Sequence, residues 1–419
     1  MIGRSSFPRL LALAAVPLFS FASEAAAADA RWSGDVAYKN RNPAVAWGVE
    51  ASAQNGFVVW ENDRLGLLGR TLDAAGDPTG AVVTLKANDP LPQVPGEGDV
   101  RLNKEPALVL DKTGRLFVVW TEELVHIRTD FFFEERVVLG RDVYAQAFDA
   151  TGAAVGSAVR VHGNPRGFQS RPAVARLSQG RSDLAVVAWD SDAGEGAVEG
   201  VFSKVFQLAT LAPLTADLAV AAGAARRPAV AASGATALFA WELAGDEQTR
   251  GLFARSLAAD TLALGKANRL SNNSSTTPSQ ASLVATQGGF LVAWTNALSA
   301  TKTRVLVRPL SSTGTPLASQ RAVSAVAARA ESVPALASRG SQVAVLWMYW
   351  GRSLAEGILA VEIDKLGNVT GSEEWLNQQL PTAGYRSALT IAPNGNVIGV
   401  WQGPDGSGRW SIRSGKLDN

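Results

Sequence analysis

Few side chains in this sequence could carry catalytic or metal chemistry. The chain has 419 residues, no cysteine and only two histidines, His126 and His162. The lack of cysteine excludes thiol nucleophiles, disulfides and iron–sulfur ligation, and two histidines are too few for a His-rich zinc centre. We therefore predict no metal site and no cofactor. A Ser-His-Asp hydrolase would have to use one of the two imidazoles.

Carboxylates are the remaining catalytic candidates. Asp-x-x-Gly segments begin at Asp73, Asp149 and Asp364. A lone Asp supplies few of the roughly six to eight oxygens that calcium takes, so turn formation explains these segments better. A glycan hydrolase or lyase would need two carboxyl groups about 5–9 Å apart. The acids that expected loops offer for such a pair are Glu97, Asp99, Glu105 and Glu331.

Clustered aromatic residues point to binding instead. Phe131, Phe132 and Phe133 follow one another directly, which is unusual in a solvated loop. They either fold back onto neighbouring structure, the interpretation we prefer, or form a partner-binding tip. The candidate binding residues are Phe131, Phe132, Phe133, His126, Arg128, Tyr349, Trp350 and Arg352.

The elements that position these residues follow a repeat marked by tryptophan. Each marker tryptophan closes a short apolar run such as GFVVW or FLVAW, and successive markers are 52 to 69 residues apart. Such runs suit strands that are buried on both faces. The seven markers are Trp60, Trp120, Trp189, Trp241, Trp294, Trp347 and Trp401.

Two further signals complete the repeat. A proline followed by small and β-branched residues precedes most markers, as at Pro43, Pro106 and Pro172, and we expect it at the first residue of a strand. After the marker comes a segment such as VYAQAFDATG, often with a fourth apolar segment behind it. Four strands in about fifty residues are typical of a propeller blade. The prediction is an all-β, seven-bladed β-propeller of four-stranded antiparallel blades.

We expect one domain, residues 29–419, with the seven repeats in 43–419. The segment 29–42 precedes the first repeat and has no partner there, so we predict that it supplies the outer strand of the last blade. This closure predicts backbone contacts between 31–38 and 408–415 and leaves no long open sheet edge. Two smaller domains are the alternative, but the regular spacing from Trp189 to Trp401 shows no break.

The markers resemble those of secreted bacterial β-propellers built from short VAW … A-x-F-D-x-x-G repeats, over roughly Pro43 to Ser414. The resemblance implies the architecture. It implies no particular activity, because propellers host lectins, hydrolases, quinoprotein dehydrogenases and scaffolds alike. The sialidase-type Asp box, Ser-x-Asp-x-Gly-x-Thr-Trp, is absent from every repeat.

Residues 1–28 predict a cleaved signal peptide. Arg4 and Arg9 precede an apolar run from Leu10 to Ala22, and small residues follow it. The run is shorter than the ~20 residues of a spanning helix, and no other segment predicts a transmembrane span. The formal charge of the whole chain is +1, and since the leader itself carries +1, the mature chain is neutral. A neutral chain lacks the electrostatic footprint of a nucleic-acid binder.

The repeated residues have structural explanations. We expect the marker tryptophans to pack between blades rather than to stack on sugars. A polar residue follows most markers and a basic residue recurs in the next strand. Glu61 with Arg70, Asp190 with Lys204 and Glu242 with Arg255 are predicted to pair across hairpins, an interpretation that we prefer to a ring of ligand sites.

The departures from the repeat suggest where a partner binds. Blade 2 carries an inserted hairpin at 122–140, and a long connection at 88–104 precedes it. Both should emerge on one face, together with 349–352 of blade 6, and we hypothesise a binding surface there. We expect a non-enzymatic, secreted or periplasmic, monomeric propeller that binds a protein or carbohydrate partner through this face. The alternative is a glycan hydrolase or lyase that uses loop carboxylates at the central channel.

Overall fold

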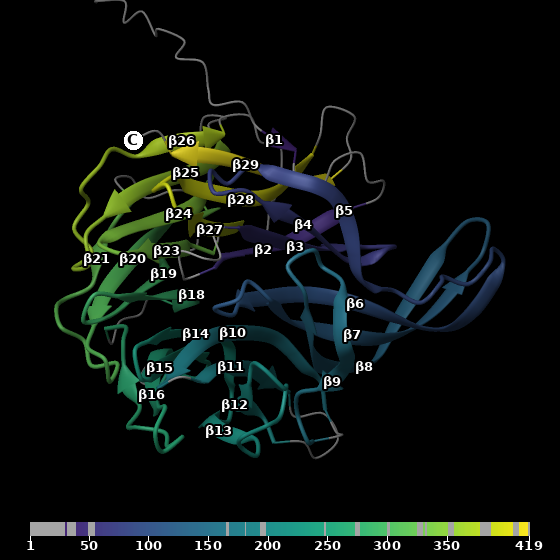
Figure 1. The fold of residues 1–419 in the computed structure, drawn as a ribbon, viewed down its shortest axis with the longest axis horizontal. Coiled ribbons are helices and arrows are strands. Elements are labelled where there is room, and N and C mark those ends of the chain that lie inside the picture. Colours follow the sequence, from purple (N-terminus) through teal and green to yellow (C-terminus); the bar gives the residue numbers. More distant parts are fainter. Residues whose placement is uncertain are drawn as a thin grey trace, which may run out of the picture.

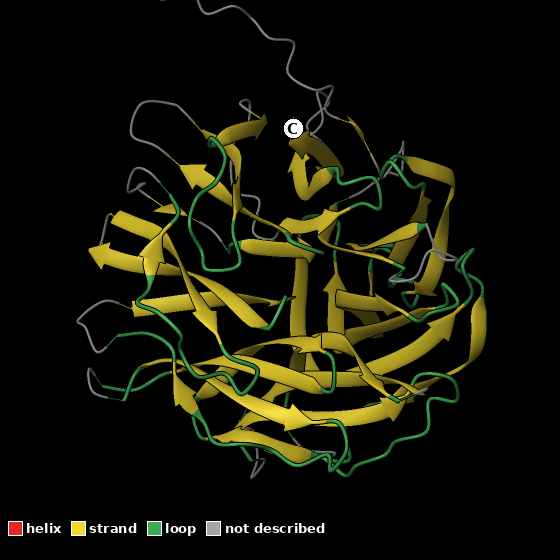
Figure 2. Ribbon diagram, turned by 60° about the vertical axis from the view of Figure 1, so that its left-hand side comes forward, coloured by secondary structure: helices red, strands yellow, loops and turns green. Residues whose placement is uncertain are grey.

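The chain folds into sheets that surround a central axis (Figures 1 and 2). The structure, a computed structural model, describes residues 30–31, 39–48, 55–164, 167–180, 182–192, 198–246, 249–272, 277–299, 302–324, 330–331, 333–350, 356–377, 387–404 and 410–417. The predicted signal peptide, 1–28, lies outside these ranges. Every regular element in the described ranges is a β-strand. No helix in these ranges is long and apolar enough to cross a membrane.

The strands form seven antiparallel sheets in chain order. Blade 1 contains β2 (Asn40–Trp47), β3 (Gly56–Asn62), β4 (Gly66–Leu72) and β5 (Pro78–Ala87). Blade 2 contains β6 (Gly96–Leu110), β7 (Leu116–Thr129), β8 (Glu134–Phe148) and β9 (Ala154–Arg160). Blade 3 contains β10 (Gln169–Gln179), β11 (Ser182–Ser191), β12 (Gly200–Gln207) and β13 (Leu218–Ala222). Blade 4 contains β14 (Ala225–Ser233), β15 (Thr236–Leu243), β16 (Gly251–Ala258) and β17 (Asn268–Arg269).

The remaining sheets repeat this order with small changes. Blade 5 contains β18 (Thr277–Thr286), β19 (Gly289–Ser299), β20 (Lys302–Leu310) and β21 (Arg321–Ala322). Blade 6 splits its inner strand into β22 (Ala330–Glu331) and β23 (Ala335–Arg339), followed by β24 (Gln342–Trp350), β25 (Glu356–Ile363) and β26 (Glu374–Asn377). Blade 7 contains β27 (Ser387–Ile391), β28 (Val397–Pro404), β29 (Trp410–Leu417) and β1 (Ala30–Arg31). The chain is a seven-bladed β-propeller, as its repeats predict.

The N-terminal strand lies at the outer edge of blade 7. In β1, Ala30 pairs with Ser414 and Arg31 pairs with Arg413 of β29. The described pairing covers these two residues, and 32–38 of the predicted closing segment lie outside the described ranges. The predicted boundary between the closing segment and the first repeat, at residue 42, falls inside a strand, because β2 of blade 1 begins at Asn40.

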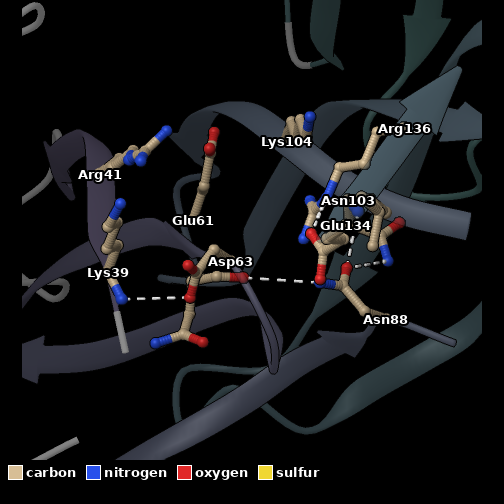
Figure 3. Close-up of a pocket in the computed structure, with 11 residues that line it drawn as sticks. Lys39, Arg41, Glu61, Asp63, Asn88, Asn103, Lys104, Glu134 and Arg136 are labelled. Carbon is tan, nitrogen blue, oxygen red and sulfur yellow. Dashed lines mark hydrogen bonds and ion pairs between the residues drawn. The ribbon is translucent and has the colours of Figure 1, made fainter. Parts of the chain in front are cut away.

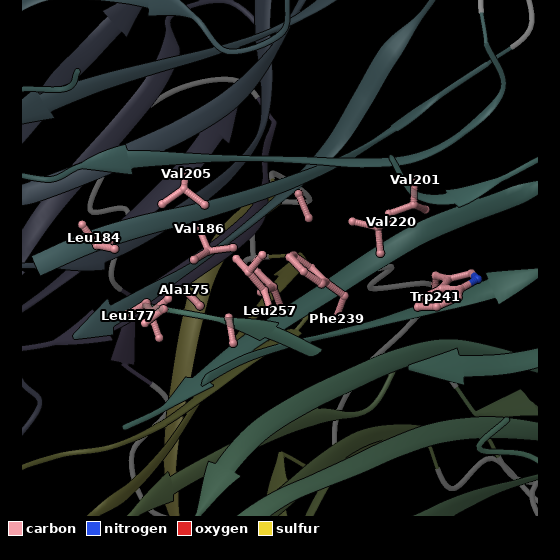
Figure 4. Packing of buried hydrophobic residues seen from close by; sticks show 14 of the residues in the cluster. Ala175, Leu177, Leu184, Val186, Val201, Val205, Val220, Phe239, Trp241 and Leu257 are labelled. Carbon is pink, nitrogen blue, oxygen red and sulfur yellow. The ribbon is translucent and has the colours of Figure 1, made fainter. Parts of the chain in front are cut away.

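The hydrophobic core is divided among the seven contacts between neighbouring blades. One buried cluster occupies each contact, and each contains one marker tryptophan. Between blades 3 and 4, one cluster contains Phe239 and Trp241 of blade 4, and Trp241 lies at the end where Val201 and Val220 of blade 3 are found (Figure 4). All seven markers are buried, so packing between blades explains them and sugar stacking does not.

The prediction that the repeated prolines begin strands is wrong in blades 1 to 4, where each proline lies inside the inner strand. In the first four blades the residue before each proline has a positive φ, between 48° and 52°, and Gln280 has a φ of 59° at the corresponding place in blade 5. The pairing register shifts at each of these points. A β-bulge of this kind re-aims the strand without ending it, so the proline sits where the ladder is already interrupted.

Candidate functional site

The inner strands enclose a channel along the axis of the ring. Its volume is about 570 Å³, and residues from all seven blades line it. The bulged residues lie along one part of this lining and carry polar side chains: Asn42, Glu105, Arg171, Arg227 and Gln280. This ring of polar groups is the channel's main candidate for chemistry.

The backbone N–H of each bulged residue is bonded to a side chain of the preceding blade. The N–H of Asn42 donates to Gln402 Oε1 at 3.0 Å, and that of Glu105 donates to Glu61 Oε2 at 3.2 Å. In blade 4, Arg227 donates to Asp190 Oδ2 at 3.0 Å. The acceptors Gln402, Glu61 and Asp190 each directly follow a marker tryptophan. The repeat therefore places one hydrogen bond of this kind, here called a latch, at each of these blade contacts.

The two other described latches show how the pattern adapts. The N–H of Gln280 in blade 5 donates to Glu242. At the contact of blades 2 and 3 the marker is followed by the short Thr121, and Glu105 takes its place: Glu105 Oε2 accepts from the N–H of Arg171 at 3.0 Å and from Thr121 Oγ1 at 3.1 Å. These acids therefore form hydrogen bonds between neighbouring blades.

Asp190 is a buried member of this network with several hydrogen-bond donors around it. Its carboxylate accepts from Ser170 Oγ at 2.9 Å and from Arg171 Nη1 at 2.7 Å, in addition to the N–H of Arg227. Burial raises the pKa of Asp190 above its usual range, although Arg171 and these hydrogen bonds act in the opposite direction. The desolvation cost outweighs the stabilisation of the charge.

The predicted cross-hairpin ion pairs are wrong. Glu61 lies opposite Leu67, and Arg70 lies opposite Val58. The acids reach inward to the channel, whereas the basic residues reach outward: Arg255 Nε donates to Gly265 O at 2.6 Å, and its Nη1 donates to Val220 O of blade 3 at 3.0 Å. Arg255, one of the basic residues that recur in the strand after the marker, thus forms a second kind of link between blades, farther from the axis.

Glu105 is not brought together with Asp99 or Glu97, two other acids expected for a catalytic pair. Glu105 lies on the inner strand β6, not on a loop. Asp99 precedes it by six residues, which is about 20 Å along a strand, and its Oδ1 is 2.8 Å from His126 Nδ1 at an exposed position. Glu97 lies two residues farther out, and the side chain of Glu331 lies outside the described residues.

The Asp-x-x-Gly segments form turns. In the first, Asp73 Oδ1 accepts from the N–H groups of Ala75 and Asp77 at 2.9 and 3.0 Å, and Gly76 adopts a φ of 87°. Asp149 and Asp364 accept equivalent bonds. Among the described residues no cluster of three or more His, Asp or Glu side chains could hold a metal ion.

His162 lies in the connection between blades 2 and 3. Its side chain is buried, and its ring lies 6.3 Å from that of Trp189. Nδ1 is 2.6 Å from Asn164 O, and Nε2 is 2.9 Å from Asp142 Oδ1. These contacts are part of the packing between blades 2 and 3.

Blade 2 carries a long arm. Strands β6, β7 and β8 are 14 or 15 residues long, whereas β3 and β4 of blade 1 have seven each. Beyond the ring the three strands continue as one sheet that projects outward (Figure 1). The predicted connection 88–104 and hairpin 122–140 therefore do lie together, since Gly96 pairs with Thr129 and Arg128 pairs with Glu135.

The tip of the arm is exposed, so the preferred fold-back of the phenylalanines is wrong. The exposed fractions of Phe131, Phe132 and Phe133 are 71%, 95% and 49%. Val137 and Leu139 on β8 are also about half exposed. Exposed apolar groups that gather in this way mark binding sites more often than scattered ones do.

The arm is anchored by its own packing and charges. Val100, Leu102, Val125 and Ile127 form a small buried cluster. At the base, Glu123 forms ion pairs with Lys104 and with Arg141, whose Nε lies 2.7 Å from Glu123 Oε1. Burial alone would raise the pKa of Glu123, but the two cations together hold it below its usual range.

The blade 6 cluster does not join this surface. Tyr349 is half-buried, and its ring meets that of Trp375 edge-on at 5.7 Å. The side chain of Trp350 and the whole of Arg352 lie outside the described residues. Blades 6 and 2 are also three steps apart around the ring. Of the three predicted segments, the described structure unites 88–104 and 122–140.

A polar cleft of about 280 Å³ separates the arm from blade 1 (Figure 3). Asn88 Oδ1 accepts from the N–H of Asn103 at 2.7 Å, and Asp63 Oδ1 accepts from the N–H of Lys39 at 3.1 Å. The lining mixes cations with acids, so the cleft has little net charge. Its charged residues are Lys39, Arg41, Lys104, Arg136, Glu61, Asp63 and Glu134.

Comparisons with known proteins support the architecture. No family model and no curated protein matches the chain. A protein of unknown function from Dyadobacter fermentans is 14% identical, with a TM-score of 0.52, over 78% of this chain and 100% of its own. Kuenenia stuttgartiensis hydrazine synthase is 9% identical, with a TM-score of 0.50, over 90% and 97%. An oligogalacturonate lyase from Vibrio parahaemolyticus is 9% identical, with a TM-score of 0.48, over 95% of each chain.

At these identities the first two likenesses, with TM-scores of 0.52 and 0.50, show the fold alone. The chain is a seven-bladed β-propeller whose inner polar ring joins its blades and whose second blade extends into an arm.

Proposed function

We propose that this chain is an exported, non-enzymatic binding protein that holds a protein partner with the arm of blade 2. One observation carries the proposal: three successive phenylalanines, Phe131 to Phe133, are exposed at the end of a sheet that the ring does not need. Large aromatic side chains dominate the energy of protein interfaces. The export rests on the predicted signal peptide.

The arm suits a binding role because it is pre-organised. Its own buried cluster and the ion pairs of Glu123 hold the three strands together. Binding therefore costs little ordering entropy in the scaffold itself. An exposed phenylalanine on such a scaffold gains most of its burial energy on contact with an apolar pocket.

The charge at the tip favours a protein over an anionic membrane or nucleic acid. Asp130, Glu134 and Glu135 outnumber Arg128 and Arg136, so the tip carries a net charge of −1. Surfaces that bind anionic lipids or phosphates carry clustered Lys and Arg. A carbohydrate site is also less favoured, because Tyr349, one of its expected platforms, is packed against Trp375.

The carboxylates of the channel support binding over hydrolysis. Glu61, Glu105, Asp190 and Glu242 are all engaged in hydrogen bonds that join blades. A general acid or base must reach the substrate, and these acids would have to release a blade contact to do so. A glycan hydrolase is therefore the weaker candidate.

Photo-crosslinking tests the proposal. The chain would carry p-benzoyl-phenylalanine in place of Phe132, and a matched control would carry it in place of Leu366, an exposed turn residue of blade 6. In cells of the source organism, we expect a discrete protein adduct at position 132 and none at 366. Equal adduct patterns at both positions would refute binding by the arm.

A further inference from the structure

The outer edge of the arm is an unpaired strand. Strand β8 pairs with β7 along its whole length, but β9 pairs with it only at Tyr144 to Phe148. A single bridge joins Arg141 to Phe168. In the described chain no strand lies against the outer side of 134–140. An open edge presents backbone donors and acceptors to another strand.

This edge lacks some of the features that usually prevent such pairing, although Glu134, Glu135 and Arg136 are charged. Residues 134–138, EERVV, contain no proline, no glycine and no lysine. The pairing with β7 is regular from Glu134 to Val138, and the register shift comes only at Leu139. Val137 is about half exposed on this edge.

We propose that the partner of the arm is a second copy of this chain, and that the two β8 edges pair antiparallel about a two-fold axis at Glu135. This inference rests on the proposed function, because it names the partner of the same surface. The result is a continuous sheet of six strands, three from each arm.

The sequence of the edge is self-complementary in this register. With Glu135 opposite its own copy, Glu134 lies opposite Arg136 of the other chain, and this pair occurs twice. Within one chain Arg136 Nε lies 2.5 Å from Glu134 Oε1, so the pairs between the chains extend an existing ion pair into a network of four charges. One residue farther out Phe133, which directly precedes β8, comes opposite Val137. Opposite charges and apolar pairs directly across strands stabilise a sheet, and the neighbouring registers lose this match. A centre at Arg136, for instance, would set Glu135 against Val137.

The one unfavourable contact is the central one. Two Glu135 side chains face each other on the axis, and like charges in this position oppose pairing. Each has Arg128 of its own β7 directly beside it, and Glu97 lies on the far side of Arg128. The arginine reduces the repulsion, and replacing Glu135 with an uncharged side chain must strengthen association.

Disulfide trapping tests the register directly, because the natural chain has no cysteine. Residues 29–419 with Glu135→Cys would be oxidised mildly and separated without reductant. At the axis the two Cβ atoms lie about 4.5–5.5 Å apart, close to the ~3.5–4.5 Å of a disulfide, so a covalent dimer forms faster there than at other exposed positions. Lys365→Cys, an exposed position in blade 6, and Arg136→Cys, one step off the axis, remain mostly monomeric.

Sedimentation velocity supplies the second measurement. Arg136→Glu should weaken dimerisation by about ten-fold or more, since it sets Glu134 against a glutamate. The double variant Glu134→Arg with Arg136→Glu restores it, and Glu135→Gln tightens it. All three positions are exposed, so the fold is retained.

The outcomes separate the inference from the function on which it rests. A protein that stays monomeric at tens of micromolar, or that oxidises no faster at position 135 than at 365, overturns the second-copy inference. If crosslinking at position 132 then yields an adduct that is not twice the mass of the chain, the arm binds a different protein and the proposed function stands. If no adduct forms either, both fail.

Discussion

The carboxylate of Asp190 in blade 3 accepts a hydrogen bond from the backbone N–H of Arg227 in blade 4, at 3.0 Å. The donor has a positive φ of 51°, a conformation that costs energy for a residue with a side chain. The same relationship recurs at each described bulge of the inner strands. A strained residue next to a proline is thus stabilised by the neighbouring blade.

We predict that the latch depends on the hydrogen bonds of Asp190 more than on its charge. Asp190→Ala leaves Ser170 and the N–H of Arg227 without this acceptor and should cost about 2–4 kcal/mol. Asp190→Asn retains an acceptor without the buried charge and should be near neutral at pH 7. Chemical denaturation of both variants provides the comparison, and equal losses would show that the charge itself is required.

The raised pKa of Asp190 fixes the sign of its pH dependence. Because the folded state favours the neutral carboxyl, its contribution to stability is complete below the ordinary pKa near 3.8 and declines as pH rises through the higher folded value. Asp190→Asn lacks this decline. The stability of the natural protein relative to the Asn variant should therefore fall between acid and neutral pH, and a rise would contradict the assignment.

The outer links between blades should contribute separately. Arg255→Met removes the bonds to Gly265 O and to Val220 O of blade 3 and should lower the free energy of unfolding by about 1–3 kcal/mol. Lys266→Met, an exposed change in the same blade, serves as the control and should stay within about 0.5 kcal/mol. Thermal unfolding of the two variants distinguishes them.

Glu123 should hold the base of the arm. Glu123→Gln weakens the pairs with Lys104 and Arg141 and should cost about 1–3 kcal/mol. Since the folded pKa of Glu123 is lowered, its contribution is present above its ordinary value near 4.5 and is lost as pH falls through the folded value. Hydrogen exchange of 124–128 should speed up in the variant at pH 7 and differ little from the natural protein in acid. Unchanged protection at pH 7 would argue against this anchor.

The repeat alone was enough to predict the blades and the burial of the tryptophans, because each apolar run needs two neighbours. The partners of the repeated acids could not be predicted in this way. Glu61 follows Trp60 in the sequence, but its oxygen reaches Glu105, 44 residues away and in the next blade. Arg70, the basic residue of the next strand in the hairpin, is therefore not its partner. The bulge at Glu105, before Pro106, could not be predicted for a similar reason, because the N–H of Glu105 donates to Glu61 of the neighbouring blade.

The arm shows the opposite difficulty. Its insertion was visible in the sequence, but local patterns do not say whether Phe131 to Phe133 pack or project. The three strands of the arm bury Val125 and Ile127 between themselves and the preceding connection. The alternating apolar residues of the strands thus form this cluster, and the turn that carries the phenylalanines lies beyond it.

The tip should be dispensable for folding. Phe131→Ser, Phe132→Ser and Phe133→Ser together remove apolar surface that is already largely in water, so unfolding should change by less than about 1 kcal/mol. Association, in contrast, should be lost. A large drop in thermal stability would mean that these rings pack in the native protein.

Competition against photo-crosslinking at position 132 tests the central claim, that the arm is the binding element, most directly. Unlabelled natural protein in excess should suppress the adduct, whereas the triple serine variant should leave its yield unchanged. Equal suppression by both competitors would show that the partner contacts the ring elsewhere and would contradict the account.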